Sequence, residues 1–175
     1  MSETLTQQYE IRDIRPDDAE AVMAIHANTW RETYVNEDIG VTEEWLTDQT
    51  ESWTSEESVE FLRAEIERGE DFHRLAFSDG ELVGIIQLST IDDTTKLMKK
   101  LFTTKPTHGT GLAQQLMSSA DEWIGDADVG LEMVTYNDRA KAFYKKYGFE
   151  VILGSESTFL DKIPTIKMIR KGDNS

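Results

Sequence analysis

The sequence feature that most constrains the fold is a long segment without acidic residues in an otherwise acidic chain. Asp and Glu make up 34 of the 175 residues and the net charge is −16, yet no acid lies between Asp93 and Asp121. This segment and a cluster that follows it carry many of the basic residues. Two neighbouring segments kept free of excess negative charge indicate an anionic ligand. The basic residues are Lys96, Lys99, Lys100 and Lys105, then Arg139, Lys141, Lys145 and Lys146.

A glycine turn inside this segment indicates where such a ligand would bind. A predicted strand, Lys96 to Thr103, leads through Pro106 into Gly109-Thr110-Gly111, where a helix begins. Glycines let backbone N–H groups face a ligand without obstruction by side chains. The start of a helix adds unpaired N–H donors and a partial positive charge. We therefore predict a concave pyrophosphate site here; a tight strand-to-helix turn without a ligand is the alternative.

The remaining pattern predicts one domain over residues 9–171, with flexible ends at 1–8 and 172–175. Apolar periodicity, capping residues and turn glycines mark the elements. Their order indicates an α/β fold with a central mixed sheet and helices on both faces. The expected strands are Tyr9–Ile14, Phe72–Phe77, Glu81–Ser89, Lys96–Thr103, Val129–Thr135, Phe149–Leu153 and Ile163–Ile169. The expected helices run from Pro16 to Trp30, Ser55 to Gly69, Gly111 to Gly125, and Asp138 to Tyr147.

Composition excludes several kinds of site and partner. The sequence has no cysteine, which rules out disulfides, thiolate nucleophiles and Cys-based metal sites. Its three histidines, His26, His73 and His108, do not have the spacing of metal ligands, so we expect no metal. The negative charge argues against a broad nucleic-acid-binding surface. Without a long apolar segment or a signal-peptide core, we expect a cytoplasmic protein with no membrane partner.

Two motifs resemble the signatures of the GNAT superfamily of N-acyltransferases. The segment His108-Gly109-Thr110-Gly111-Leu112-Ala113 resembles its acetyl-CoA motif, Arg/Gln-x-x-Gly-x-Gly/Ala. The segment from Asn137 to Phe149 resembles its Asn-x-x-Ala-x-x-Phe-Tyr-x-x-x-Gly-Phe signature. The resemblance covers roughly Tyr9 to Lys171. One position departs: His108 replaces Arg or Gln, so cofactor affinity would depend on pH, unless His108 is simply an exposed loop residue.

The resemblance implies a single-domain GNAT-like fold, a mixed and mostly antiparallel sheet, and acetyl-CoA as co-substrate without a metal. Backbone groups of 101–103 would pair with the pantetheine arm like an added strand. The amides of 109–113 would hold the pyrophosphate, and Asn137 would hydrogen-bond the arm. The implied cofactor-binding residues are Leu101, Phe102, Thr103, His108, Gly109, Thr110, Gly111, Leu112, Ala113, Asn137, Lys141 and Tyr144.

The resemblance also implies a role for Tyr144 as the general acid that protonates the departing thiolate. A half-buried aromatic residue of a helix is the alternative. The acceptor amine must lose a proton before it attacks, and many family members carry a Glu for this on the strand before the pyrophosphate loop. Here that strand, Lys96 to Leu101, has no acid. We expect Glu132 as the base, with His26, Glu32 or a water relay as alternatives.

The segment from His26 to Tyr34 resembles the acceptor-side helix of GNAT subgroups that include polyamine and phosphinothricin-type acetyltransferases. Trp30 and Tyr34 are four residues apart and share a helix face. They are expected to bind the acceptor, with packing in the core as the alternative. A small cationic amine such as a polyamine agrees with the acidic composition. Adaptation to high salt, or an ordinary solvated surface, also explains that composition.

We therefore expect an acetyl-CoA-dependent N-acetyltransferase that transfers the acetyl group directly to a primary amine of a small molecule or peptide. The lack of a cysteine nucleophile agrees with direct transfer. One alternative is a non-catalytic acyl-CoA-binding or regulatory protein with the same fold. Another is a structural subunit with vestigial motifs. The resemblance also allows a homodimer, since GNAT proteins are often dimeric.

Overall fold

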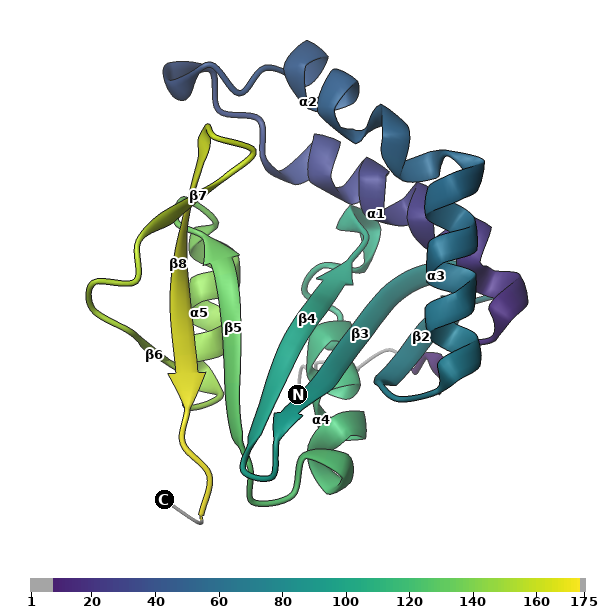
Figure 1. Ribbon diagram of the computed structural model, residues 1–175, viewed down its shortest axis with the longest axis vertical. Coiled ribbons are helices and arrows are strands. Elements are labelled where there is room, and N and C mark those ends of the chain that lie inside the picture. The colour runs from purple at the N-terminus through teal and green to yellow at the C-terminus, as the bar shows by residue number, and fades with distance from the viewer. Residues whose placement is uncertain (1–7, 174–175) are drawn as a thin grey trace, which may run out of the picture.

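The computed structural model describes residues 8–173 and shows a curved sheet with helices around it (Figure 1). The predicted flexible ends, 1–8 and 172–175, fall mainly on residues outside this range.

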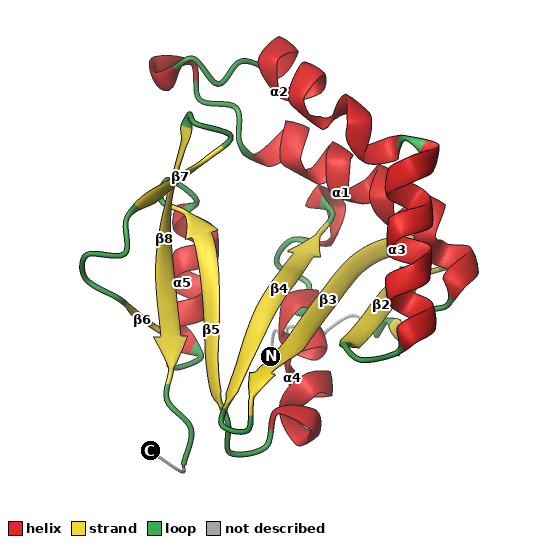
Figure 2. Ribbon diagram, viewed as in Figure 1, coloured by secondary structure: helices red, strands yellow, loops and turns green. Residues whose placement is uncertain are grey.

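Helices and strands follow one another in the predicted order, with two additions (Figure 2). The helices are α1 (Ala19–Thr33), α2 (Glu43–Thr50), α3 (Glu56–Arg68), α4 (Leu112–Ile124) and α5 (Asp138–Lys146). The strands are β1 (Glu10–Asp13), β2 (Phe72–Ser78), β3 (Glu81–Asp92), β4 (Thr95–Thr103), β5 (Asp128–Val134), β6 (Glu150–Val151), β7 (Ser157–Phe159) and β8 (Ile163–Arg170).

The strands form one sheet in the order β1-β2-β3-β4-β5-β8-β6, with β7 also paired to β8. β4 and β5 are parallel, whereas the other recorded pairs are antiparallel. The prediction of a mixed, mostly antiparallel sheet is therefore confirmed. The single parallel pair lies in the middle of the sheet, which places the crossover helix α4 on one face.

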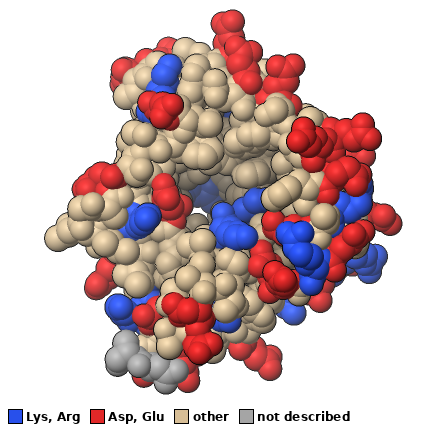
Figure 3. Space-filling view, in the orientation of Figure 1, with Lys and Arg blue, Asp and Glu red and all other residues tan. Residues whose placement is uncertain are grey.

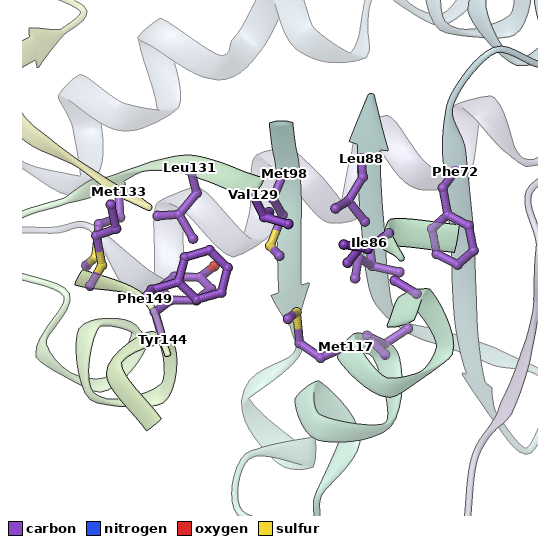
Figure 4. Packing of buried hydrophobic residues seen from close by; sticks show 14 of the residues in the cluster. Phe72, Ile86, Leu88, Met98, Met117, Val129, Leu131, Met133, Tyr144 and Phe149 are labelled. Atoms are coloured by element: carbon purple, nitrogen blue, oxygen red, sulfur yellow. The ribbon is translucent and has the colours of Figure 1, made fainter. Parts of the chain in front are cut away.

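Helices cover both faces of the sheet, as predicted. α1 and α3 pack on the face that carries Leu75 and Ile85. α4 packs on the opposite face, where Met117 lies in one cluster with Ile86 (Figure 4). From α5, Tyr144 extends this second cluster below β5. The face of α1 and α3 is called the front below, and the face of α4 and α5 the rear.

Local signals placed two of the elements correctly. Asp79 and Gly80 have φ of 50° and 83°, the left-handed backbone of a two-residue hairpin turn between β2 and β3. At the start of α3, the Ser55 side chain accepts a hydrogen bond of 3.2 Å from the Ser58 N–H. This is the cap expected from the sequence.

Three segments differ from the predictions. The strand expected over Phe149–Leu153 is reduced to the two residues of β6, because the chain turns outward and leaves Leu153 91% exposed. Helix α2 was not predicted; Thr42 caps it by accepting the Trp45 N–H at 3.0 Å. Strand β7 was not predicted either, since three residues are too few for an alternating pattern.

Candidate active site

The sheet opens between its two parallel strands. β4 and β5 share four register pairs, from Thr95–Asp128 to Met98–Leu131. Beyond these pairs the strands diverge, and Figure 1 shows them splaying apart toward the glycine turn and α5. Cavities lie on both faces of this split. The sequence did not predict the split, because it is a property of strand pairing.

A β-bulge sets which side chains of β4 face the front. Neighbouring residues of β3 pair with Met98 and Lys100, so Lys99 is the extra residue. After the bulge, Leu101 packs with the rear core and Phe102 with the front core. Because side chains alternate along a strand, Lys100 shares the front face with Phe102.

The front cavity has a volume of about 270 Å³. Helix α1, both edges of the split and the β7 segment enclose it. Figure 3 shows it as a hollow at the centre of this face, with basic side chains on its wall and acidic ones around much of its rim. Its wall combines aromatic and charged groups: His26, Trp30, Tyr34, Phe102 and Phe159 with Lys99, Lys100 and Glu132.

The rear cavity, of about 180 Å³, lies between β4, the start of α4 and α5, and the end of α1 closes one side through Thr29, Thr33 and Tyr34. It brings together many of the residues predicted to bind the cofactor. Those that line it are Leu101, Phe102, Thr103, His108, Ala113, Asn137 and Tyr144. Residues 101–103 lie on the edge of β4 that β5 leaves unpaired, so their backbone is open to an added strand.

Tyr144 lines both cavities and lies where they meet. Its side chain is 8% exposed, and no group in residues 8–173 hydrogen-bonds its hydroxyl. Burial raises the pKa of Tyr144, and the nearby Tyr34 raises it further. The phenol therefore keeps its proton through the neutral range.

Asn137 connects the two sides of the split. Its Oδ1 accepts the Ala140 N–H at 3.2 Å and so caps α5. Its Nδ2 donates to the Tyr34 hydroxyl at 3.3 Å, and the Tyr136 hydroxyl donates to the Tyr34 carbonyl at 2.6 Å. These bonds hold the end of α1 against the loop between β5 and α5.

The glycine turn leaves backbone donors free at the start of α4. Gly109 and Gly111 have φ of 81° and 88°, and a Cβ at Gly109 would meet open space. The first helical bond runs from the Gln115 N–H to the Gly111 carbonyl, and no side chain caps this end. The amides of Leu112 and Ala113 therefore precede that bond and face outward. This end can hold an anion.

Other residues of the turn have different surroundings. The Thr110 N–H donates to the Thr107 carbonyl at 3.2 Å, so this amide is already occupied. The Thr110 hydroxyl bonds the Tyr9 hydroxyl at 2.7 Å. Leu112 is 1% exposed, which buries its side chain in the core and leaves only its backbone for a ligand.

His108 is exposed, and its Nε2 lies 3.2 Å from the Thr103 carbonyl oxygen. Partial burial lowers its pKa, and the positive charge of Arg139 lowers it further. Both effects favour the neutral ring. Arg139, from the same basic cluster, lines the rear cavity, whereas Lys141 lines neither cavity.

The candidate bases lie in different places. Glu132 lines the front cavity, where its carboxylate is exposed and accepts the Thr165 hydroxyl at 2.6 Å. His26 lines the same cavity, but burial lowers its pKa to about 3. Glu32 lines neither the front nor the rear cavity.

Trp30 and Tyr34 line the front cavity and also pack in the core. Their rings lie 4.4 Å apart, and the Trp30 ring is 5.0 Å from that of Phe159. Both line the front cavity, and both pack against the small core of Val41 and Leu46. They are thus core residues with one side open to the cavity.

Comparison with known proteins identifies the fold and its family. The sequence matches the family model described as an acetyltransferase (GNAT) domain over residues 30–171. The chain belongs to the GNAT acetyltransferase family. A search of curated proteins finds no match.

Solved structures of other acetyltransferases share the fold. PaiA N-acetyltransferase from Thermoplasma acidophilum, in complex with coenzyme A, is 21% identical over 94% of this chain and 99% of its own, with a TM-score of 0.74. Ard1 from Thermoplasma volcanium is 24% identical over 93% and 96%, with a TM-score of 0.62. Arabidopsis thaliana NAA60, in complex with a bisubstrate analogue, is 16% identical over 96% and 100%, with a TM-score of 0.68.

This GNAT enzyme is an acetyl-CoA-dependent N-acetyltransferase, and its residues fit the co-substrate. The open amide end of α4 suits a pyrophosphate, and the unpaired edge of β4 suits an arm that carries amides. Among the described residues, no group of His, Asp and Glu is placed to hold a metal ion, and no helix is long and apolar enough to cross a membrane.

Proposed function

We propose that the enzyme transfers the acetyl group of acetyl-CoA, bound from the rear cavity, to a primary amine bound in the front cavity. The position of Tyr144 supports this proposal most directly. Its unpartnered hydroxyl lies where the two cavities meet, which is where a thioester reaching from the rear would face an amine entering from the front. Direct transfer needs only this meeting point and no enzyme nucleophile.

The co-substrate would bind mainly through the backbone. Leu101, Phe102 and Thr103 would pair with the pantetheine arm, and the free amides of Leu112 and Ala113 would hold the pyrophosphate. Arg139 would add positive charge beside His108, whose lowered pKa favours the neutral ring. Asn137, already fixed by the cap of α5, would donate to the arm with its remaining amide hydrogen.

In the proposed reaction, Glu132 takes a proton from the acceptor ammonium, directly or through water. The amine nitrogen then forms a bond to the acetyl carbonyl carbon while the carbon–sulfur bond breaks. Tyr144 donates its proton to the departing sulfur, and solvent restores it. Because burial raises the pKa of Tyr144, the phenol still carries its proton when the thiolate forms and can hydrogen-bond the departing sulfur.

The acceptor would approach as a cation and lie against Trp30 and Tyr34. The net charge of −16 attracts cationic small molecules, such as a polyamine, or the amino group of a peptide. The aromatic walls of the front cavity favour a positive group over their faces.

Replacement of Tyr144 by Phe tests the proposal. It keeps the ring in the core and removes only the hydroxyl, so we expect kcat to fall roughly 100-fold while the Kd of coenzyme A, measured by calorimetry, is kept. Tyr147→Phe on the same helix is the matched control, because Tyr147 lines neither cavity. Equal turnover by the Tyr144 and Tyr147 variants would rule out Tyr144 as the acid.

A further inference from the structure

We propose that the acceptor amine carries a carboxylate, and that Lys100 binds it. The inference rests on the proposed function and narrows its acceptor class to amino acids and closely related zwitterions. Lys100 would then be a specificity-determining residue of the front cavity, with no direct part in proton transfer.

The first observation is the position of Lys100. The bulge at Lys99 turns the Lys100 side chain to the front, onto the wall of the cavity, where it is half-buried. It lies close enough to His26 for its charge to lower the pKa of that ring. A basic residue is therefore built into the cavity wall at the point where the strands begin to separate.

The second observation is that Lys100 has no hydrogen-bond or ion-pair partner within residues 8–173. Burial lowers the pKa of Lys100, and the negative charge of Glu65 opposes this only in part. A half-buried ammonium without a direct partner is costly. The nearby carboxylates are already engaged. Asp71 pairs with Lys99 at 3.3 Å and also accepts from Gln87 at 2.9 Å, while Glu65 accepts from Gln87 at 2.6 Å. An anionic ligand group would supply the missing partner.

The third observation is the opposite charge across the split. Glu132 extends into the same cavity from β5, directly after the last register pair of the two strands. The Thr165 hydroxyl donates a hydrogen bond to the Glu132 carboxylate, and Glu132 forms no ion pair with Lys100. The cavity thus presents an anion on one wall and a cation on the other. Between them an ammonium would face Glu132 and a carboxylate would face Lys100.

A simple polyamine fits this arrangement less well. It would satisfy Glu132 but would bring a second positive charge toward Lys100, and like charges repel. A basic amino acid keeps the net positive charge that the acidic surface attracts and adds the carboxylate. The observations therefore favour amino acids over the corresponding amines.

Matched acceptor pairs test the proposal, each differing by one carboxylate: lysine and cadaverine, ornithine and putrescine, phenylalanine and 2-phenylethylamine. Release of coenzyme A gives kcat/KM for each. We expect the wild-type enzyme to prefer the amino acid of a pair by roughly 10- to 100-fold, the range of one charge-assisted contact. Lys100→Gln should abolish this preference by slowing the amino acid, while cadaverine and putrescine, relieved of the repulsion by Lys100, should not slow. Lys100→Arg should keep part of it.

Lys96→Gln is the control, because it removes the same charge from β4 where Lys96 lies over the Trp123 ring, outside both cavities. It should leave the preference unchanged. Wild-type preference for the amines would overturn the proposal, as would an equal loss on both members of each pair in Lys100→Gln. If Lys100→Gln does not fold, the wild-type ratios decide. Failure of the proposed function differs: no acceptor would release coenzyme A although it still binds.

Discussion

The indole N–H of Trp30 donates a hydrogen bond of 3.1 Å to Nε2 of His26, one turn earlier on α1. The His26 ring also stacks between Trp53 and Phe102, with centroid distances of 4.9 and 5.1 Å. As an acceptor, Nε2 carries no proton, so the ring is the neutral Nδ1–H tautomer. His26 is thus part of the front wall, with one nitrogen already occupied.

We therefore predict that His26 does not act as the base. His26→Gln should lower kcat by less than about tenfold, below the range of a lost acid or base. Because the pKa of His26 is about 3, the pH profile of kcat should keep its shape above pH 5 in this variant. Loss of an ionisation between pH 5 and 8 on substitution would contradict this.

Glu132 is predicted to be the residue whose loss affects proton removal. Glu132→Gln keeps the size of the side chain and an acceptor for Thr165, so the local structure should survive. We expect kcat/KM to fall roughly 100-fold at pH 7, with partial recovery at high pH as the free amine becomes abundant. Glu32→Gln is the comparison, since Glu32 lines neither cavity. If Glu132→Gln turned over as fast as Glu32→Gln, Glu132 would not be the base.

His73 is predicted to make the fold less stable in acid. It is 7% exposed, its Nε2 has no partner among the described residues, and burial with the charge of Lys100 lowers its pKa to about 3. An unfolded histidine titrates near pH 6.5, so between pH 6.5 and 3 the unfolded chain binds the extra proton. The free energy of unfolding should fall as the pH drops through this window, by at most about 1.4 kcal/mol per pH unit.

Urea unfolding at pH 7 and pH 4.5 measures this effect. His73→Gln should reduce the difference between the two pH values by about 2 kcal/mol, because Gln does not titrate. The exposed His108 serves as the control, and His108→Gln should change the difference far less. An unchanged difference in His73→Gln would show that other groups cause the acid sensitivity.

Arg139, and not Lys141, is predicted to contribute charge to co-substrate binding. Arg139 lines the rear cavity and Lys141 does not, although they are two residues apart on α5. Arg139→Gln should weaken coenzyme A binding roughly tenfold, as expected for one charged contact, with the loss shrinking at high salt. Lys141→Gln should stay within about twofold. Calorimetry of both variants at two salt concentrations separates a direct contact from a change in overall charge.

Much of the fold was predictable because local signals and long-range packing agree in most elements. The turn at Asp79-Gly80 and the cap at Ser55 are examples in which the residue type determines the backbone. α2 and β7 were missed because they depend on tertiary packing. The Trp45 ring of α2 lies below the Lys162 ammonium, and β7 exists only as a partner of β8.

The residues of the site could be predicted only where they lie within the two sequence motifs. Most residues of the rear cavity lie in two segments that hold the motifs, 101–113 and 137–144, and many of these were anticipated, while the end of α1 adds Thr29, Thr33 and Tyr34. The front cavity is built from five separate parts of the chain. Lys100 faces it because Lys99 forms a bulge, and a bulge shifts the alternation that a sequence pattern assumes. The role proposed for Lys100 could not be derived without the strand register.

The four register pairs between β4 and β5 also have a cost in stability. Two parallel strands of this length could pair further, and each added backbone hydrogen bond would contribute about 1 kcal/mol. A chain with more backbone hydrogen bonds between β4 and β5 would be more stable but inactive, because the split where the two cavities meet would close. Selection for stability alone would therefore reduce the activity of this enzyme. Designs that stabilise it should strengthen the outer strands and leave the split between β4 and β5 open.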